Sequence, residues 1–302
     1  MKRKLTFALL LSTAASVVFA ATPVAGPITL ELKPSIGLKT TLIISEKVNT
    51  TMSMMGQEMT MGSNTNSDYS LVARKDSAGL KSFTTVFNST VKSMEQMGSK
   101  IDINTTDPKA DTTSETTGSL VKFYKHLTGR PYIVYLDKTG NVVSTAGAKE
   151  IFKSASSSLD LTGPMAMMKS IVNEAVLTAD LKKAFNYAPG KAINVGDKWD
   201  RKDTVASNGV GMQFATKFTF DKLEGNVATI KANSIINFDG DMESVPGATA
   251  KIIGTAVYTT KVNVDNGMLI SSVGDIDMEI NMKAQGMEIP MKVSTNTTIT
   301  TK

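Results

Sequence analysis

Methionine is the side chain in this sequence whose number and spacing could support chemistry. The chain has 18 methionines, and two clusters at 52–61 and 282–291 share one pattern, with Met four residues before a glycine and five residues after it. Thioether sulfur is a soft ligand that selects Cu(I), and it is also a flexible apolar group that lines pockets or fills cores. Because Met52, Met54, Met59 and Met61 would share one strand face, packing or pocket lining is the favoured interpretation, and copper binding is the alternative.

Nucleophilic catalysis has few candidates in this chain. His126 is the only histidine, and a catalytic triad needs that base beside a nucleophile, for which no G-x-S-x-G elbow occurs. Ser119-Leu-Val-Lys122 and Lys138-Thr-Gly140 match two motifs of penicillin-interacting enzymes, but the S-D-N motif of those enzymes is missing. We therefore expect His126 to lie at the surface or to cap a helix, and we predict no catalytic residue.

A divalent metal site is a further chemical possibility. Asp239, Asp241 and Glu243 place three carboxylates at alternate positions beside a glycine, and Ca²⁺ prefers oxygen ligands of this kind. The spacing of a calcium-binding loop and its later glycine are missing, so a solvated loop is the favoured interpretation and calcium binding stays open. No metal site and no cofactor is predicted.

The first twenty residues have the pattern of an export signal. Residues 2–4 are positively charged, residues 5–19 are apolar, and the small residues Val18 and Ala20 precede an expected cleavage site before Ala21. Without those three cations, the formal charge of +5 falls to about +2 in the mature chain. No dense basic run with interleaved aromatic residues follows, so nucleic acid is not an expected partner.

The absence of cysteine limits both the fold and the mode of anchoring. The chain has no Cys, which excludes disulfides, thiol nucleophiles and lipidation of the mature N-terminus. No stretch after the signal is apolar enough to predict a transmembrane segment. We therefore expect an exported protein that is periplasmic, extracellular or at the cell surface and is not lipid-anchored, and the sequence indicates no protein partner.

The order of elements predicts a single β-rich domain over residues 21–302. Runs rich in Thr, Val, Ile and Met at 38–104 and 193–301 predict antiparallel strands, and helical spacing at 148–188 predicts helices between them. We also expect three smaller elements, a surface loop, a short helix and a hairpin, at 107–118, 119–127 and around 137–140. The predicted fold class is mainly β (α+β): a large curved antiparallel sheet or half-barrel built from both ends of the chain, with central helices covering its concave face.

The central segment contains two apolar helical stripes that need a surface to cover. Pro164 can take the first position of one helix. Its buried stripe would consist of Met167, Met168, Ile171, Val172 and Ala175. Thr178 can cap a second helix, with Asp180 near its positive end. The buried side of that helix would consist of Leu181, Ala184 and Phe185.

The second methionine cluster predicts a strand register. With Gln285-Gly286 as a two-residue turn, one face would pair Ala284 with Met287, Met282 with Ile289, Ile280 with Met291, and Met278 with Val293. The other face would pair Lys283 with Glu288 and Glu279 with Lys292, which places opposite charges across the ladder. A third, fainter copy at 94–101 would pair Glu95 with Lys100. Hydrophobic pattern and charge pattern therefore agree on one register.

Several short motifs together carry a family resemblance. They are 52–61, the hairpin 132–140, the segments 184–189 and 195–199, and the turn 264–267. With these motifs the chain resembles an uncharacterised, domain-of-unknown-function family of exported bacterial β-rich proteins. More distantly, its layout is similar to envelope lipoprotein carriers, which implies an incomplete barrel around a lipid-binding cavity with helices as its lid.

The favoured function is that of a non-enzymatic exported binding module for a hydrophobic ligand or an envelope component. A lipid or small apolar molecule would contact a Met-rich lining. The residues expected to line the ligand are Met52, Met54, Met59, Met61, Met278, Met282 and Met291. The alternative is a packed structural or surface interaction protein without a ligand cavity, and a carboxylate-dependent hydrolase is a distant third.

Overall fold

The structure is a computed structural model. It describes residues 26–302 apart from 55, 97–98, 158, 160–173, 208–209, 243–246 and 285. The export signal expected at 1–20 lies outside the described residues, as does most of the helix expected to begin at Pro164. None of the described helices is long and apolar enough to cross a membrane.

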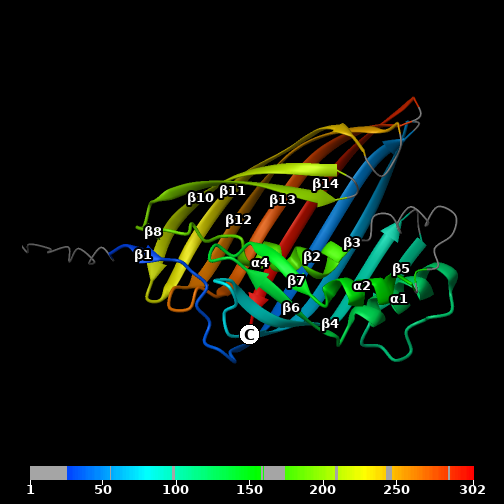
Figure 1. The fold of residues 1–302 in the computed structure, drawn as a ribbon. Coiled ribbons are helices and arrows are strands. Elements are labelled where there is room, and N and C mark those ends of the chain that lie inside the picture. The colour runs from blue at the N-terminus through cyan, green and yellow to red at the C-terminus, as the bar shows by residue number, and fades with distance from the viewer. Residues whose placement is uncertain are drawn as a thin grey trace, which may run out of the picture.

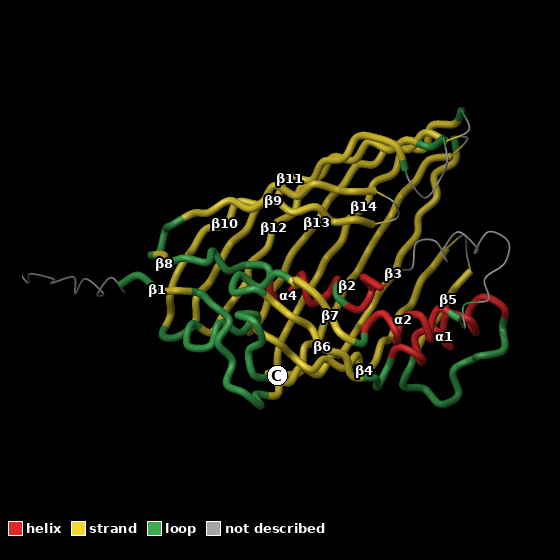
Figure 2. Tube along the Cα trace, viewed as in Figure 1, coloured by secondary structure: helices red, strands yellow, loops and turns green. Residues whose placement is uncertain are grey.

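Most of the chain forms one long, curved antiparallel sheet (Figures 1 and 2). Its strands from the first half of the chain are β2 (Lys39–Met54), β3 (Gln57–Ala73), β4 (Lys81–Gln96), β5 (Ser99–Asn104), β6 (Pro131–Leu136) and β7 (Val142–Ala146). Those from the second half are β9 (Lys198–Ser207), β10 (Val210–Glu224), β11 (Val227–Asp241), β12 (Thr249–Asn263), β13 (Leu269–Ala284) and β14 (Met287–Thr301). The predicted mainly β class is confirmed.

The two ends of the chain meet in the middle of the sheet. Eleven of its twelve strands run in the order β7-β6-β4-β3-β2-β14-β13-β12-β11-β10-β9, and the twelfth, β5, pairs with β4. Because β14 pairs with β2, the last strand lies beside the first long one. In the described residues the outer strands β7 and β9 do not pair with each other, so the sheet stays open. A small separate sheet pairs β1 (Ile28–Thr29) with β8 (Ala192–Ile193).

The predicted register at the second methionine cluster is confirmed. Met282 lies opposite Ile289, and Lys283 lies opposite Glu288 with 3.6 Å between Nζ and Oε1. The fainter third copy also has the expected pairing, with Glu95 opposite Lys100. There, however, the Lys100 ammonium forms its ion pair with Asp102 at 3.0 Å, a residue on its own strand face. These strands therefore have one apolar and one polar face, as the alternation predicts.

The helices lie on the concave side of the sheet, across its lower part in Figure 1. They are α1 (Glu115–Leu127), α2 (Ala148–Ser156), the 3-10 helix η2 (Glu174–Leu177) and α4 (Ala179–Phe185). Thr178 is the N-cap residue of α4 as expected, and Leu181, Ala184 and Phe185 are buried as expected. The ring of Phe185 stacks on Phe83 of β4 with centroids 5.9 Å apart. Burial of each such side chain stabilises the fold by about 1.5–3 kcal/mol.

Helix α1 begins four residues earlier than the expected start at Ser119. The side chain of Ser114 caps it by accepting a hydrogen bond from the Gly118 N–H. Asp111 orders the preceding turn, because its carboxylate accepts hydrogen bonds from Thr113 and Ser114. Hydrogen bonds from Thr113, and then from Ser114, lower the pKa of Asp111 to about 2. The polar stretch expected to be a surface loop is therefore partly a helix start, made by capping side chains.

The two open edges approach each other through one hairpin tip. The turn between β6 and β7 carries Asn141, and Arg201 of β9 donates a hydrogen bond to it and a longer one, 3.4 Å, to Thr139 Oγ1. Gly140 in the same turn has φ +86, and a Cβ there would collide with the carbonyl group of Phe185. Hairpin, helix α4 and strand β9 are thereby held together at this end of the sheet.

Candidate functional site

The concave face carries two cross-strand rows rich in methionine, which we call the methionine rows. Successive pairings in the sheet define them. The first consists of Met61, Thr50, Val293, Met278, Gly254 and Ile236, and the second of Met59, Met52, Met291, Ile280, Ile252 and Phe238. Met282 lies one pair further along, between Ile289 and Ala250. The sheet therefore brings together methionines that are 230 positions apart in the sequence.

The side chains of the methionine rows are half-buried in most cases. This holds for Met52, Met59, Met61, Met278, Met282 and Met291. Met54 lies opposite Gln57 at the end of β2, and its side chain lies outside the described part. Among the described residues, these methionines do not join the main core, which gathers the Leu, Phe and Tyr side chains under the helices. The rows are a separate apolar surface, and flexible thioethers make such a surface adaptable.

A polar row crosses the same concave face nearer the helices. It consists of Lys92, Thr65, Glu46 and Thr297, and it continues into Gly274 and Tyr258. Glu46 and Met52 are six residues apart on β2, so about 20 Å separates the polar row from the second methionine row. The concave face is therefore graded from charged to apolar along the strands.

Helix α4 supplies the partners of the polar row. Lys183 Nζ lies 2.9 Å from Glu46 Oε1 and 3.8 Å from Asp180 Oδ1. The hydroxyl group of Tyr69 donates to Asp180 Oδ2 at 2.9 Å. The three charged residues thus form one connected network between helix and sheet, in which both carboxylates share one ammonium group.

The enclosure between helix and sheet shifts the protonation of this network. Burial raises the pKa of Asp180, against the opposing effects of Lys183 and of the Tyr69 hydroxyl. Burial alone would lower the pKa of Lys183, but the carboxylates of Asp180 and Glu46 raise it above its ordinary value. Although 39% of the Lys183 side chain is exposed, water screens the pair only in part. Because each carboxylate is held by the same lysine, neither is a free acid or base.

Lys92 differs from Lys183 in its partners. It lies on the concave face of β4, between Thr65 and Ile103 in the neighbouring strands. Burial lowers its pKa, and Glu46 and Asp180 offset this only in part. In the described part of the chain, Lys92 forms no ion pair.

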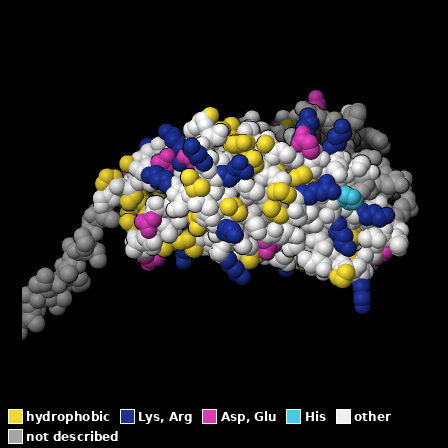
Figure 3. All heavy atoms as spheres, turned by 60° about the horizontal axis from the view of Figure 1, so that its bottom comes forward, with side chains coloured by type: hydrophobic (Ala, Val, Ile, Leu, Met, Phe, Trp, Pro, Cys, Tyr) yellow, Lys and Arg dark blue, Asp and Glu magenta, His cyan; other side chains and the backbone are white. Residues whose placement is uncertain are grey.

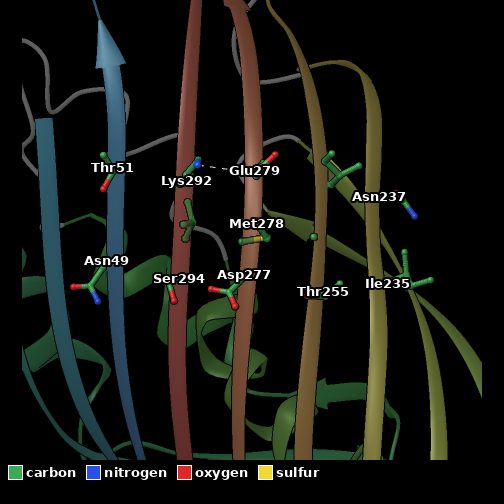
Figure 4. Close-up of a pocket in the computed structure, with 13 residues that line it drawn as sticks. Asn49, Thr51, Ile235, Asn237, Thr255, Asp277, Met278, Glu279, Lys292 and Ser294 are labelled. Atoms are coloured by element: carbon green, nitrogen blue, oxygen red, sulfur yellow. Dashed lines mark ion pairs between the residues drawn. The ribbon is translucent and has the colours of Figure 1, made fainter. Parts of the chain in front are cut away.

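A groove of about 580 Å³ lies on the opposite, outer face of the sheet (Figure 4). It follows two cross-strand rows, Asn49 to Ile235 and Thr51 to Asn237. Ile235 and Ile253 in it are 59% and 48% exposed, beside the ion pair of Lys292 and Glu279. Nothing in the sequence indicates this groove, because the same polar and β-branched residues are ordinary on a solvated strand face.

The other predicted chemical groups do not come together. His126 lies in the last turn of α1, where Nδ1 is 2.8 Å from the Lys122 carbonyl oxygen. Figure 3, in which the only histidine is cyan, shows it at the surface among lysine and arginine side chains. Lys138-Thr-Gly140 forms the hairpin tip described above, whereas Ser119 belongs to α1.

Two of the three carboxylates considered for calcium are not in a solvated loop as expected. Asp239 and Asp241 lie within β11, where both are exposed on the outer face, because the strand continues through Gly240. Glu243 lies outside the described residues. Within the described ranges, no three His, Cys, Asp or Glu side chains are grouped closely enough to hold a metal ion.

Comparisons with known proteins identify a family. The model of a family of unknown function, DUF6263, matches residues 78–269, which is more than half of the chain. The chain therefore belongs to this family. No curated protein sequence matches it.

Similar solved structures are β-rich. A structure titled for lipid–protein interactions in lipovitellin has 7% identity and a TM-score of 0.44, covering 89% of this chain and 25% of that one. An outer membrane channel from Pseudomonas putida F1 has 7% identity and a TM-score of 0.25, covering 90% and 97%. The translocator domain of the autotransporter NalP from Neisseria meningitidis has 7% identity and a TM-score of 0.21, covering 88% and 89%. This chain thus spans about a quarter of the lipovitellin chain, and none of these likenesses carries an argument about function.

Proposed function

We propose that this member of DUF6263 is a non-enzymatic exported module that holds a hydrophobic ligand, such as a lipid, against the concave face of its sheet. The observation that carries the proposal is the pair of methionine rows. Their side chains are contiguous across six strands, mostly half-buried, and separate from the packed core. Contiguous apolar surface of this kind is typical of ligand or partner contact.

The predicted lining residues fit this location. Met52, Met59 and Met61 come from one hairpin, and Met278, Met282 and Met291 come from another on the same side of the sheet. A shared concave side lets one ligand contact both hairpins. The expected export signal supports a place in the periplasm or outside the cell, where envelope lipids are available.

A matched pair of variants tests which face binds. Met52→Glu places a charge on the concave face, and Thr51→Glu places the same charge one residue away on the outer face, at the groove. We expect a lipophilic fluorophore to bind the wild type and Thr51→Glu equally, and Met52→Glu at least tenfold more weakly, because a buried charge is costly. Native mass spectrometry should show an apolar ligand co-purifying with the wild type.

The outer groove favours a second function, that of a surface interaction protein. Exposed Ile235 and Ile253 lie there within a polar surround. Three results together would support this second function and contradict the first. Native mass spectrometry would show the protein without a ligand, the wild type would not bind the fluorophore, and only Thr51→Glu would lose binding to a partner protein.

A further inference from the structure

The polar row contains one charged side chain, Lys92, that does not take part in the network of Lys183, Glu46 and Asp180. Lys183 is shared by the carboxylates of Glu46 and Asp180, and the Tyr69 hydroxyl also donates to Asp180. Lys92 lies in the same row, two strands from Glu46, and it forms no ion pair with a described residue. Both carboxylates of this region therefore pair with Lys183.

A half-buried ammonium group without a close counter-ion is unfavourable. Removal of water disfavours the charged form, and only a nearby anion or good hydrogen-bond acceptors restore it. Here the cross-strand neighbours of Lys92 are the short polar Thr65 and the apolar Ile103. An anionic group arriving at Lys92 would supply the missing partner, in a charge-assisted hydrogen bond.

The apolar surface begins directly beside this lysine. Met94 is the next residue of β4 on the concave face, opposite Ser63. Met61 and then Met59 follow on β3, two and four residues beyond Ser63. The span of about 20 Å from the polar row to the second methionine row matches the reach of a long acyl chain.

We propose that the ligand is an amphiphile with an anionic head group, bound with its head at Lys92 and its acyl chain along the methionine rows. This inference rests on the proposed function and adds the ligand's chemical class and orientation to it. The shared chemistry is a carboxylate or phosphate oxygen beside the ammonium group. A fatty acid and a lysophospholipid would both provide it.

Binding of matched probes to the full mature chain tests this. Oleate and oleyl alcohol have the same chain and differ in the charge of the head, and oleoyl lysophosphatidate carries a phosphate. We expect the wild type to bind oleate or the lysophosphatidate at least about tenfold more tightly than the alcohol, the range expected of one charge-assisted hydrogen bond. Lys92→Gln should remove that preference and leave the affinity for the alcohol unchanged.

The control is Lys47→Gln, which removes an exposed lysine from the outer face of β2. It should behave like the wild type. Lys92→Met serves as a second variant if Lys92→Gln folds poorly, since Met suits the apolar neighbour Met94. Which of the two anions depends on Lys92 identifies the head as carboxylate or phosphate.

Two outcomes separate the failure of this inference from the failure of the proposed function. If the alcohol binds as tightly as both anions, or if the preference survives in Lys92→Gln and Lys92→Met, the head-group assignment is wrong while the binding function stands. If none of the three probes binds the wild type, the proposed function itself fails.

Discussion

The ring of Tyr258 on β12 occupies the space in which a side chain at Gly274 of β13 would stand. A Cβ built on Gly274 would meet the ring carbons of Tyr258. The two residues are direct cross-strand partners on the concave face. A glycine in a strand interior normally weakens the strand, and an aromatic ring laid over it compensates by covering the bare backbone.

This relationship predicts that the effect of Gly274→Ala on stability changes sign when the ring of Tyr258 is removed. Gly274→Ala in the wild type should cost about 1–3 kcal/mol, because the ring of Tyr258 must leave its place. In a Tyr258→Ala background the same substitution should stabilise by about 0.5–1 kcal/mol, because alanine has less chain entropy to lose than glycine. Urea unfolding of the four proteins measures both values. Destabilisation of equal size in both backgrounds would show that the position of the Tyr258 ring does not require a glycine at 274.

The ion pair between Lys183 and Glu46 predicts a modest coupling between α4 and the sheet. Removing either partner, by Lys183→Met or Glu46→Gln, should lower stability by about 1 kcal/mol, since the pair is enclosed but Lys183 stays partly exposed. A double-mutant cycle in urea should give a coupling of about 0.5–1 kcal/mol. The control cycle uses Lys283 and Glu288, which are 67% and 56% exposed. Its coupling should be near zero, and an equal coupling would contradict a special role for the α4 pair.

Much of the sheet could be predicted because its information is local. Met282 and Ile289 are seven residues apart, and a two-residue turn fixes which side chains share a face. The same logic correctly paired Glu95 with Lys100. Alternation of polar and apolar residues then identified the concave face, because a one-residue slip would bury charges.

The rest depends on contacts that sequence spacing does not encode. Lys183 and Glu46 are 137 residues apart, and Asp180 and Tyr69 are 111 apart. No local pattern brings them together, so the sequence indicates Asp180 only as a charge near a helix start. The continuation of the polar row into Thr297, Gly274 and Tyr258 required the strand order, which brings β14 beside β2.

Asp180 predicts a loss of stability as the pH rises. Burial raises its folded pKa above the value in the unfolded chain, about 3.9. The folded state then binds its proton more tightly, so the free energy of unfolding falls as pH rises from about 4 through the folded pKa. Asp180→Asn removes this pH dependence, so its free energy of unfolding should rise relative to that of the wild type between acid and neutral pH. Chemical unfolding at a series of pH values measures the difference between the two proteins.

Asp137 predicts the opposite pH dependence of stability in the same experiment. Burial would raise its pKa, but hydrogen bonds from Asn141 and Thr139 outweigh burial and lower it. Its stabilisation is therefore present above the unfolded pKa and is lost as pH falls through the folded pKa. Asp137→Asn should lose most stability at neutral pH and little in acid. Parallel slopes for the two variants would contradict both assignments.

The hairpin tip that joins the edges of the sheet depends on a residue without a side chain. Gly140 and Gly225 both have positive φ, +86 and +60, but only at Gly140 would a Cβ collide with backbone, at Phe185. Gly225→Ala should therefore lower the free energy of unfolding by only about 1–2 kcal/mol, the cost of placing alanine in the left-handed conformation. Gly140→Ala should cost clearly more, because α4 must also move. Thermal unfolding compares the two, and equal losses would mean that the tip does not press on α4. Fluorescence of Trp199, the only tryptophan, should report the movement in Gly140→Ala alone, since its neighbour on β9, Arg201, contacts the hairpin tip.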